Sequence, residues 1–211
     1  MSVNKIKTTT YNLNSTKAET LDSLRKIGYN IPKVYFFTVD EWNKKSVKIV
    51  ENILKYFPDS LLAIRSSTKA EDTEESSMAG AFESLLNVAC KEKQIIASIK
   101  EVIASFDSDI SNQVLIQPMV TDVVMSGVIM SNVLDDGSPY HVVNYDDTTG
   151  LTDTVTSGTT INKTVYIYDG VDENDFDSSN LKRILNLIRN LKKTIPDTPL
   201  DIEFCINNDG E

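Results

Sequence analysis

The sequence predicts an α+β fold made of two lobes. In the first half, helical spacing of apolar residues alternates with short apolar runs, whereas strand-like runs dominate from Val114 onward. Turn signals such as Asp136-Gly137-Ser138-Pro139 separate the later runs, which is typical of antiparallel hairpins. We therefore expect a mixed first lobe over residues 1–116 and a second lobe, mostly antiparallel sheet, over residues 117–211.

The first lobe is expected to contain three helices and two strands. Thr16-Lys17-Ala18-Glu19 has capping-box spacing, and the apolar stripe that follows stops near Gly28, so residues 16–27 should form a short helix. The other expected elements are strands at 34–39 and 61–64 and amphipathic helices at 47–57 and 95–106.

After residue 113 the pattern of apolar residues becomes mainly strand-like, and it predicts five strands and a single helix. The strands are expected at 114–119, 126–133, 140–145, 163–168 and 200–206. Apolar residues at helical spacing between Leu181 and Leu191 predict the helix, which should end before Pro196 and Pro199.

Composition excludes several classes of protein. The net charge of −10 over 211 residues argues against a general surface for nucleic acid or anionic membrane, because the field of the whole molecule repels polyanions. Cys90 and Cys205 are far apart and each lies in an apolar stretch, which predicts buried free thiols in a reducing compartment. With no basic and apolar leader and no apolar run near the ~20 residues that cross a bilayer, we expect a cytoplasmic protein.

The most informative stretch begins at Leu62. An apolar strand delivers Arg65 into the hydroxyl residues Ser66 and Ser67, and a small-residue turn ending at Gly80 follows. A guanidinium provides a permanent forked charge, and hydroxyls and backbone N–H groups provide neutral donors, so the pattern suits a loop that covers phosphates. An acidic surface loop in which Arg65 pairs with a nearby carboxylate is the plainer alternative.

Two carboxylates lie near the end of the chain. Asp201 and Glu203 are two residues apart on an expected strand, so both should point to one face while Ile202 and Phe204 point to a core. Convergent carboxylates beside phosphate-binding groups form the hard-oxygen site that Mg²⁺ prefers. An edge strand with one wet acidic face would give the same pattern. His141, the sole histidine, alternates with apolar residues and is interpreted as a partly buried strand residue, not as a phosphoryl carrier.

The Arg65 stretch closely resembles the "VRSSATAED…SFAGQ…TFLNV" signature of the ATP-binding domain of phosphoenolpyruvate synthase and pyruvate phosphate dikinase, an ATP-grasp fold. Five further segments resemble motifs of the same family. Residues 17–38 resemble "GGKGANL…GIPVPPGFVVTT", residues 117–120 resemble "VQKMV", and residues 126–130 resemble "SGVMFT". Residues 150–158 resemble "GLGExVVxG", and residues 201–204 resemble "DIEWAID". The resemblance implies ATP and Mg²⁺ as cofactors, with the nucleotide in the cleft between the two lobes.

The resemblance also implies roles for single residues. Lys17 matches the phosphate-binding lysine, although Ser15 and Thr16 stand where the family has two glycines. Arg65 matches the arginine that neutralises charge during phosphoryl transfer. The resemblance implies that the adenine is contacted by Gln117, Pro118, Met119 and Val120. It implies that Asp153 keeps an acidic group on the side facing the nucleotide. It also implies that Glu203 binds magnesium, with Asp201 beside it.

In this family, ATP phosphorylates a carrier histidine on a swivelling domain, and a third domain passes the phosphate to an acceptor. No "GGxxCH"-like carrier segment is present, and the chain ends where the family continues into "LQxRP", so we expect an amino-terminal fragment of a longer enzyme. The string Asn144-Tyr145-Asp146-Asp147 with residues 152–158 looks most like the capsule-associated L-glutamine kinases, which phosphorylate the side-chain amide nitrogen. A phosphoenolpyruvate synthase, an antibiotic phosphotransferase and a non-catalytic nucleotide-binding module remain as alternatives.

Overall fold

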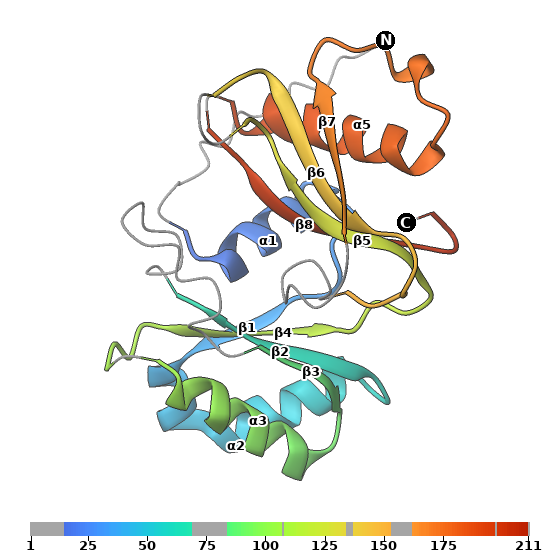
Figure 1. Cartoon of the computed structure of the whole chain (residues 1–211). Helices are drawn as coiled ribbons and strands as arrows, with labels where there is room; N and C mark the ends of the chain where they lie inside the picture. The colour runs from blue at the N-terminus through green and yellow to red at the C-terminus, as the bar shows by residue number, and fades with distance from the viewer. Residues whose placement is uncertain are drawn as a thin grey trace, which may run out of the picture. The chain divides into compact units, whose positions relative to one another are not determined.

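The computed structural model describes residues 15–68, 84–106, 108–133, 137–152, 162–196 and 198–210. It divides the chain into two compact units, Met1–Met119 and Val120–Glu211. Each unit contains one four-stranded antiparallel sheet together with helices, so the predicted α+β class is confirmed (Figure 1). No helix of the described ranges is both long and apolar enough to span a membrane.

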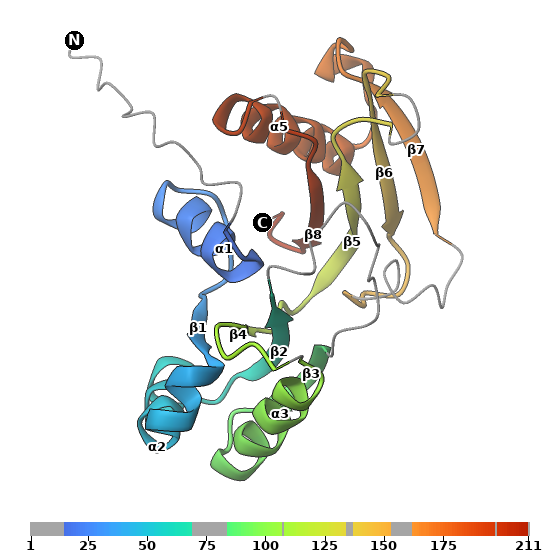
Figure 2. The same ribbon diagram turned by 90° about the vertical axis from the view of Figure 1, so that its left-hand side faces the viewer.

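The sheet of the first unit has the strand order β1-β4-β2-β3. Its strands are β1 (Tyr35–Thr38), β2 (Leu61–Ser67), β3 (Ser84–Ala89) and β4 (Gln113–Pro118), and its helices are α1 (Lys17–Lys26), α2 (Val39–Tyr56) and α3 (Glu92–Ala104). Within this unit, α2 and α3 cover one face of the sheet and α1 lies on the other (Figures 1 and 2).

Strand alternation sorts the side chains of this sheet between its two faces. Leu62 and Ile64 of β2 are fully buried in the core with α2 and α3. Leu115 of β4 packs instead with Ala18 of α1 and with Val34, and we call this side of the sheet the α1 face.

The second unit has the strand order β7-β6-β5-β8. Its elements are β5 (Val123–Met130), β6 (Tyr140–Asp146), β7 (Lys163–Tyr168), the short 3₁₀ helix η2 (Glu173–Asp175), α5 (Ser179–Thr194) and β8 (Asp201–Asn207). Ile184, Leu185 and Ile188 of α5 pack against one face of this sheet, and the core there includes Ile129 and Val143. Figure 2 shows α5 along that face.

The boundary between the units falls after Met119, three residues later than the sequence suggested. Gln117 and Pro118, which we assigned to the second lobe, pair with Ala63 and Leu62 of β2 and therefore belong to the first sheet. The backbone N–H of Met119 extends this pairing by donating to the Leu61 carbonyl oxygen at 2.8 Å.

Two elements differ from the sequence expectation for local reasons. The helix α2 begins at Val39, because Thr38 and Glu41 form a second capping box directly after β1. The strand β3 was not predicted, because it carries a bulge opposite Ala63. Asn87 in this bulge has φ 57°, so the period-two pattern of a strand is interrupted.

Candidate functional site

The α1 face of the first sheet brings Arg65 and Ser67 together. In the β2–β4 pairing, Arg65 lies opposite Leu115 and Ser67 lies opposite Gln113. Leu115 packs against α1, and directly opposed residues of antiparallel strands share a face, so all four side chains belong to the α1 face.

Ser66 lies on the other side of the same strand. It pairs with Val114, which belongs to the core with α2 and α3, and it is 5% exposed. Successive residues of a strand point to opposite faces, so Ser66 does not share a face with Arg65. The hydroxyl pair that looked equivalent in the sequence is thus divided by the sheet.

The first turn of α1 is held against this face next to Ser67. Thr16 caps the helix with a complete capping box to Glu19, and Lys17 is the first helical residue. The buried backbone N–H of Ala18 donates to Ser67 Oγ at 2.9 Å. The bond places the backbone of Lys17 beside the end of β2, and the lysine side chain is partly exposed.

A second buried hydroxyl follows β2. Thr68 is 1% exposed, and its Oγ1 has no hydrogen-bond partner among the residues that the structure describes. A buried hydroxyl without a partner costs about 1–3 kcal/mol. Sequence reasoning did not single it out, because the signature contains several hydroxyl residues of the same kind.

The segment expected to meet the adenine is part of an ordinary sheet up to Met119. The pairing of β4 with β1 ends at Ile116 and Tyr35. Beyond this point Pro118 has no N–H to donate, and the N–H of Met119 is used by Leu61. Val120, the last residue of the expected segment, belongs to the second unit.

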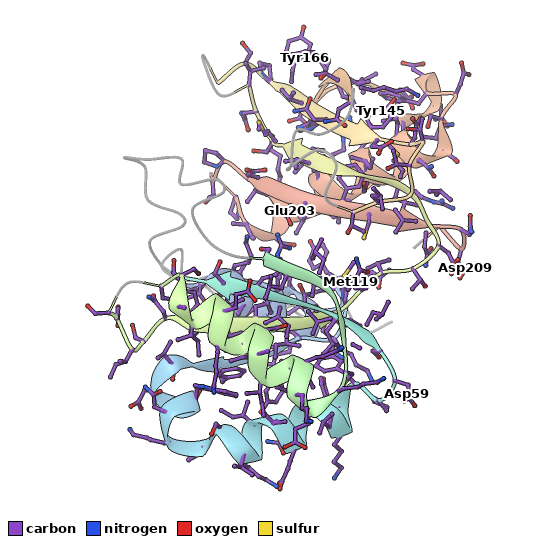
Figure 3. All side chains as sticks on the ribbon, turned by 60° about the horizontal axis from the view of Figure 1, so that its bottom comes forward. Asp59, Met119, Tyr145, Tyr166, Glu203 and Asp209 are labelled. Carbon is purple, nitrogen blue, oxygen red and sulfur yellow. The ribbon has the colours of Figure 1, made fainter. Side chains whose placement is uncertain are left out.

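Asp201 and Glu203 lie on β8, at the edge of the second sheet (Figure 3). Both are exposed, and the neighbouring Ile202 and Phe204 pack into the core with α5, so the two carboxylates share the opposite face. Burial, with the charge of Glu203 as a second cause, raises the pKa of the Cys205 thiol. Within the described ranges, no histidine, cysteine or further carboxylate lies close enough to Asp201 and Glu203 to complete a three-residue metal site.

Two further predicted site residues, Gly80 and Asp153, lie outside the described residues. The acidic residues that precede Asp153 have local partners. The buried Asp146 carboxylate accepts bonds from the backbone and side chains of Thr148 and Thr149. Asp147 pairs with Lys163 at 2.7 Å.

His141 lies in β6, as predicted, but it is fully buried where partial burial was expected. Its Nδ1 lies 2.8 Å from the carbonyl oxygen of Ser131, and its Nε2 lies 3.1 Å from Asp169 Oδ1. Because both ring nitrogens have partners and no ring atom reaches solvent, this histidine is not placed to carry a phosphoryl group.

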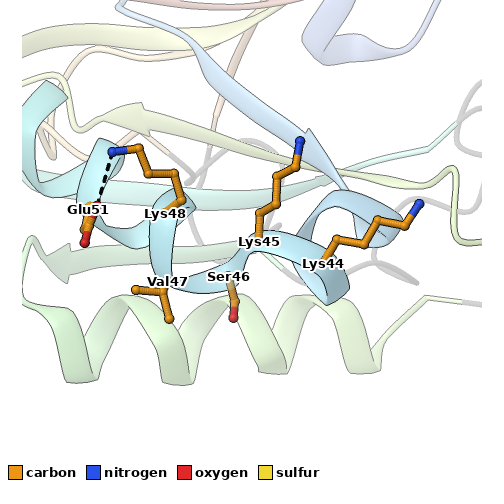
Figure 4. A pocket seen from close by; sticks show the side chains of 6 residues that line it. All are labelled: Lys44, Lys45, Ser46, Val47, Lys48 and Glu51. Atoms are coloured by element: carbon orange, nitrogen blue, oxygen red, sulfur yellow. Dashed lines mark hydrogen bonds and ion pairs between the residues drawn. The ribbon is translucent and has the colours of Figure 1, made fainter.

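An open pocket of about 400 Å³ lies along α2. It is lined by residues 44–48 and by Glu51, and the backbone of Lys45 (φ −142°, ψ 28°) interrupts the helix there. In Figure 4 the lysine side chains point away from Ser46 and Val47, and Lys48 is paired with Glu51. The pocket adjoins α2 and does not include any predicted site residue.

Comparison with known proteins identifies the family. The model of the pyruvate phosphate dikinase AMP/ATP-binding domain matches residues 1–190. This chain belongs to that family. The two units, each with a sheet and helices, agree with the α+β class that the sequence predicted. Asp201 and Glu203 lie beyond the matched residues, so their assignment depends on the local motif alone.

Solved structures include two similar ligases. One is the D-alanine-D-alanine ligase from Coxiella burnetii, with 14% identity, a TM-score of 0.49, and coverage of 92% of this chain and 43% of that chain. The other is the VanG D-Ala:D-Ser ligase from Enterococcus faecalis, with 14% identity, a TM-score of 0.46, and coverage of 92% and 48%. The chain spans less than half the length of either protein. The comparison with curated proteins found no match.

Proposed function

We propose that this ATP-binding domain binds Mg·ATP and serves an ATP-dependent phosphotransferase. The observation that carries the proposal is the bond from the Ala18 N–H to Ser67 Oγ, because it joins the helix that bears Lys17 to the strand that bears Arg65. Two positively charged residues, one on α1 and one on the sheet face that α1 covers, suit a polyphosphate, all the more in a chain whose net charge is −10.

Lys17 and Arg65 are proposed to have different roles. A lysine is a compact point charge that neutralises phosphate oxygens, whereas the planar guanidinium of Arg65 donates in a fork that can follow charge as it develops. Phosphoryl transfer leaves little covalent chemistry to the protein, so positioning and electrostatic stabilisation are the main contributions of such residues.

Asp201 and Glu203 are proposed to hold Mg²⁺. Their oxygens have the hardness that this ion prefers, and both side chains reach solvent. Mg²⁺ usually takes one or two protein carboxylates and fills its octahedral shell with water and phosphate oxygens. The absence of a third carboxylate or histidine within the described ranges is therefore compatible with this ion. When bound, it would neutralise charge on the phosphates.

The acceptor of the phosphate is a finer proposal. We propose a carrier histidine on another domain of the full-length protein, because the single histidine of this chain is buried and bonded on both nitrogens. From there, the proposed acceptor is the amide nitrogen of L-glutamine, for capsule phosphoramidate synthesis. This acceptor rests on the resemblance of residues 144–147 and 152–158. Phosphoenolpyruvate synthesis and antibiotic phosphorylation are the rival reactions.

Calorimetry with Mg·ATP tests the central proposal. We expect saturable binding that weakens when Mg²⁺ is chelated and when Lys17→Ala removes the positive charge from the first turn of α1. The matched control is Lys26→Ala at the other end of the same helix, where the lysine is exposed and paired with Asp22. Failure of the full-length protein to bind ATP with Mg²⁺ would overturn the proposal.

A further inference from the structure

We propose that Ser67 and Gln113 are positioning residues that hold the first turn of α1, and with it Lys17, in fixed register with Arg65. The inference rests on the proposed binding of phosphate by Lys17 and Arg65. Neither positioning residue needs to touch the nucleotide, because both act through the backbone and cap of α1.

The two residues form one cross-strand pair. Ser67 of β2 lies directly opposite Gln113 of β4, and they are 0% and 6% exposed. Their side chains reach the same helical turn, since the Ala18 N–H donates to Ser67 Oγ at 2.9 Å and Thr16 Oγ1 donates to Gln113 Oε1 at 2.5 Å. Both residues that flank Lys17 in the sequence are thus anchored to the sheet.

Gln113 also closes the capping box into a ring. Its Nε2 donates to Glu19 Oε1 at 2.8 Å, and Glu19 Oε2 accepts from the Thr16 backbone N–H at 3.2 Å. Both polar ends of the Gln113 amide are therefore used, and both carboxylate oxygens of Glu19 have donors. The bonds of this network are buried or partly buried, and a well-paired network of this kind fixes one geometry, whereas an unpaired polar group within it would be costly.

The contrast with α2 separates positioning from simple capping. Thr38 and Glu41 form the same capping box there, and the bonds described for the two side chains remain within that box. A threonine–glutamate box therefore starts a helix by itself. The additional bonds of α1 tie it to Gln113 of β4 and to Ser67 of β2. Arg65 lies on β2 two residues before Ser67, on the same face.

Binding measurements on Ser67→Ala, Gln113→Ala and Thr16→Val test the inference. Affinities for Mg·ATP and for adenosine would be measured by calorimetry and competition, and exchange of the Ala18 amide hydrogen by mass spectrometry or NMR. Each variant should weaken Mg·ATP about tenfold, the effect of one strong hydrogen bond, while adenosine affinity stays within about twofold. Ser67→Ala should also speed exchange at Ala18.

Two further variants serve as controls. Thr16→Ser keeps the hydroxyl and should retain the affinity of the wild type for Mg·ATP. Thr38→Val removes the equivalent cap from α2, so it should lower the melting temperature without changing Mg·ATP affinity.

The outcomes distinguish this inference from the function on which it rests. If the wild type binds Mg·ATP and Ser67→Ala and Gln113→Ala bind it equally well, the positioning role is wrong and the proposed function stands. Equal loss of adenosine and Mg·ATP affinity would also overturn it, because the effect would then be general unfolding. If the wild type itself does not bind Mg·ATP, the proposed function fails first.

Discussion

Arg65 is the side chain whose charge the proposed chemistry needs most at the moment of transfer. It is partly exposed on the α1 face, at the strand end from which the signature loop departs. Because interactions that strengthen in the transition state raise turnover more than ground-state binding, Arg65→Ala should lower kcat far more than it weakens ATP binding in the full-length enzyme.

Arg65→Lys should recover only part of the lost turnover, because it restores the charge and not the fork. Exposed Arg25→Ala on α1 is the control and should leave both constants unchanged. Steady-state kinetics and direct nucleotide binding would be measured side by side. Parallel losses of kcat and affinity would contradict a role specific to the transition state.

Glu203 is the carboxylate assigned to magnesium on β8. Glu203→Gln keeps the size of the side chain and removes its charge, so the Mg²⁺ concentration needed for half-maximal ATP binding should rise. The exposed Asp209→Asn, in the same unit, removes one negative charge outside the proposed site. Identical magnesium titrations for Glu203→Gln and the wild type would show that the metal is held elsewhere.

Gly127 shows at the level of a strand why one position must lack a side chain. It lies on β5 opposite Tyr145, and an added Cβ would overlap the carbonyl oxygen of Asn144 and lie 2.8 Å from Tyr145 Cα. Both obstacles are backbone atoms, so Gly127→Ala should reduce the free energy of unfolding by at least about 2 kcal/mol.

Gly137→Ala provides the comparison for Gly127→Ala. Its φ is 68° and a Cβ would meet no atom of the described residues within 4 Å, so the expected loss is the roughly 1 kcal/mol of a left-handed alanine. Urea denaturation would give both values. A smaller loss for Gly127→Ala than for Gly137→Ala would contradict the close approach of β5 and β6.

The Asp169 side chain bonds to His141 of β6 and to Lys192 of α5, so its titration should affect how the second unit responds to acid. The hydrogen bond from Lys192, together with the charges of Lys192 and His141, lowers the pKa of Asp169. A lowered pKa in the folded state means that the stabilisation is complete well above the ordinary aspartate pKa of 3.8 and is lost as the pH falls through and below that value.

Asp169→Asn should therefore flatten the decrease in stability below about pH 4 and lower stability at neutral pH. The exposed carboxylate of Asp175 provides the matched Asp175→Asn control. Unfolding midpoints measured between neutral and acidic pH would decide. If the stability of Asp169→Asn fell with pH as steeply as that of the wild type, protonation of Asp169 would not be the cause of the acid destabilisation.

For the whole molecule, the open question is the acceptor. The full-length enzyme is expected to convert ATP, L-glutamine and water into AMP, phosphate and an N-phosphorylated amide, whereas pyruvate should be inert. The reason is the departure from the dikinase pattern at Thr152-Asp153, together with residues 144–147. Phosphorus NMR would show a phosphoramidate signal with glutamine. Formation of phosphoenolpyruvate from pyruvate would assign the protein to the rival class.

The sequence alone determined the family, the α+β class and nearly all of the elements. Apolar periodicity and the capping box of Thr16 are local properties, so α1, α3, α5 and most strands lie within a few residues of their predicted bounds. The signature around Arg65 led to the family that the comparison shows. The strand β3 was missed because a bulge at Asn87 hides its alternation.

Only the tertiary structure decided which of these residues act together. Ser66 and Ser67 are adjacent hydroxyls in the sequence, but the sheet sends one toward the core with α2 and α3 and the other toward α1. Gln113 is 97 residues from Thr16 and carried no recognisable motif, yet strand pairing places it opposite Ser67 and beneath the cap of α1. Such partners are set by long-range strand register, which local sequence patterns do not encode.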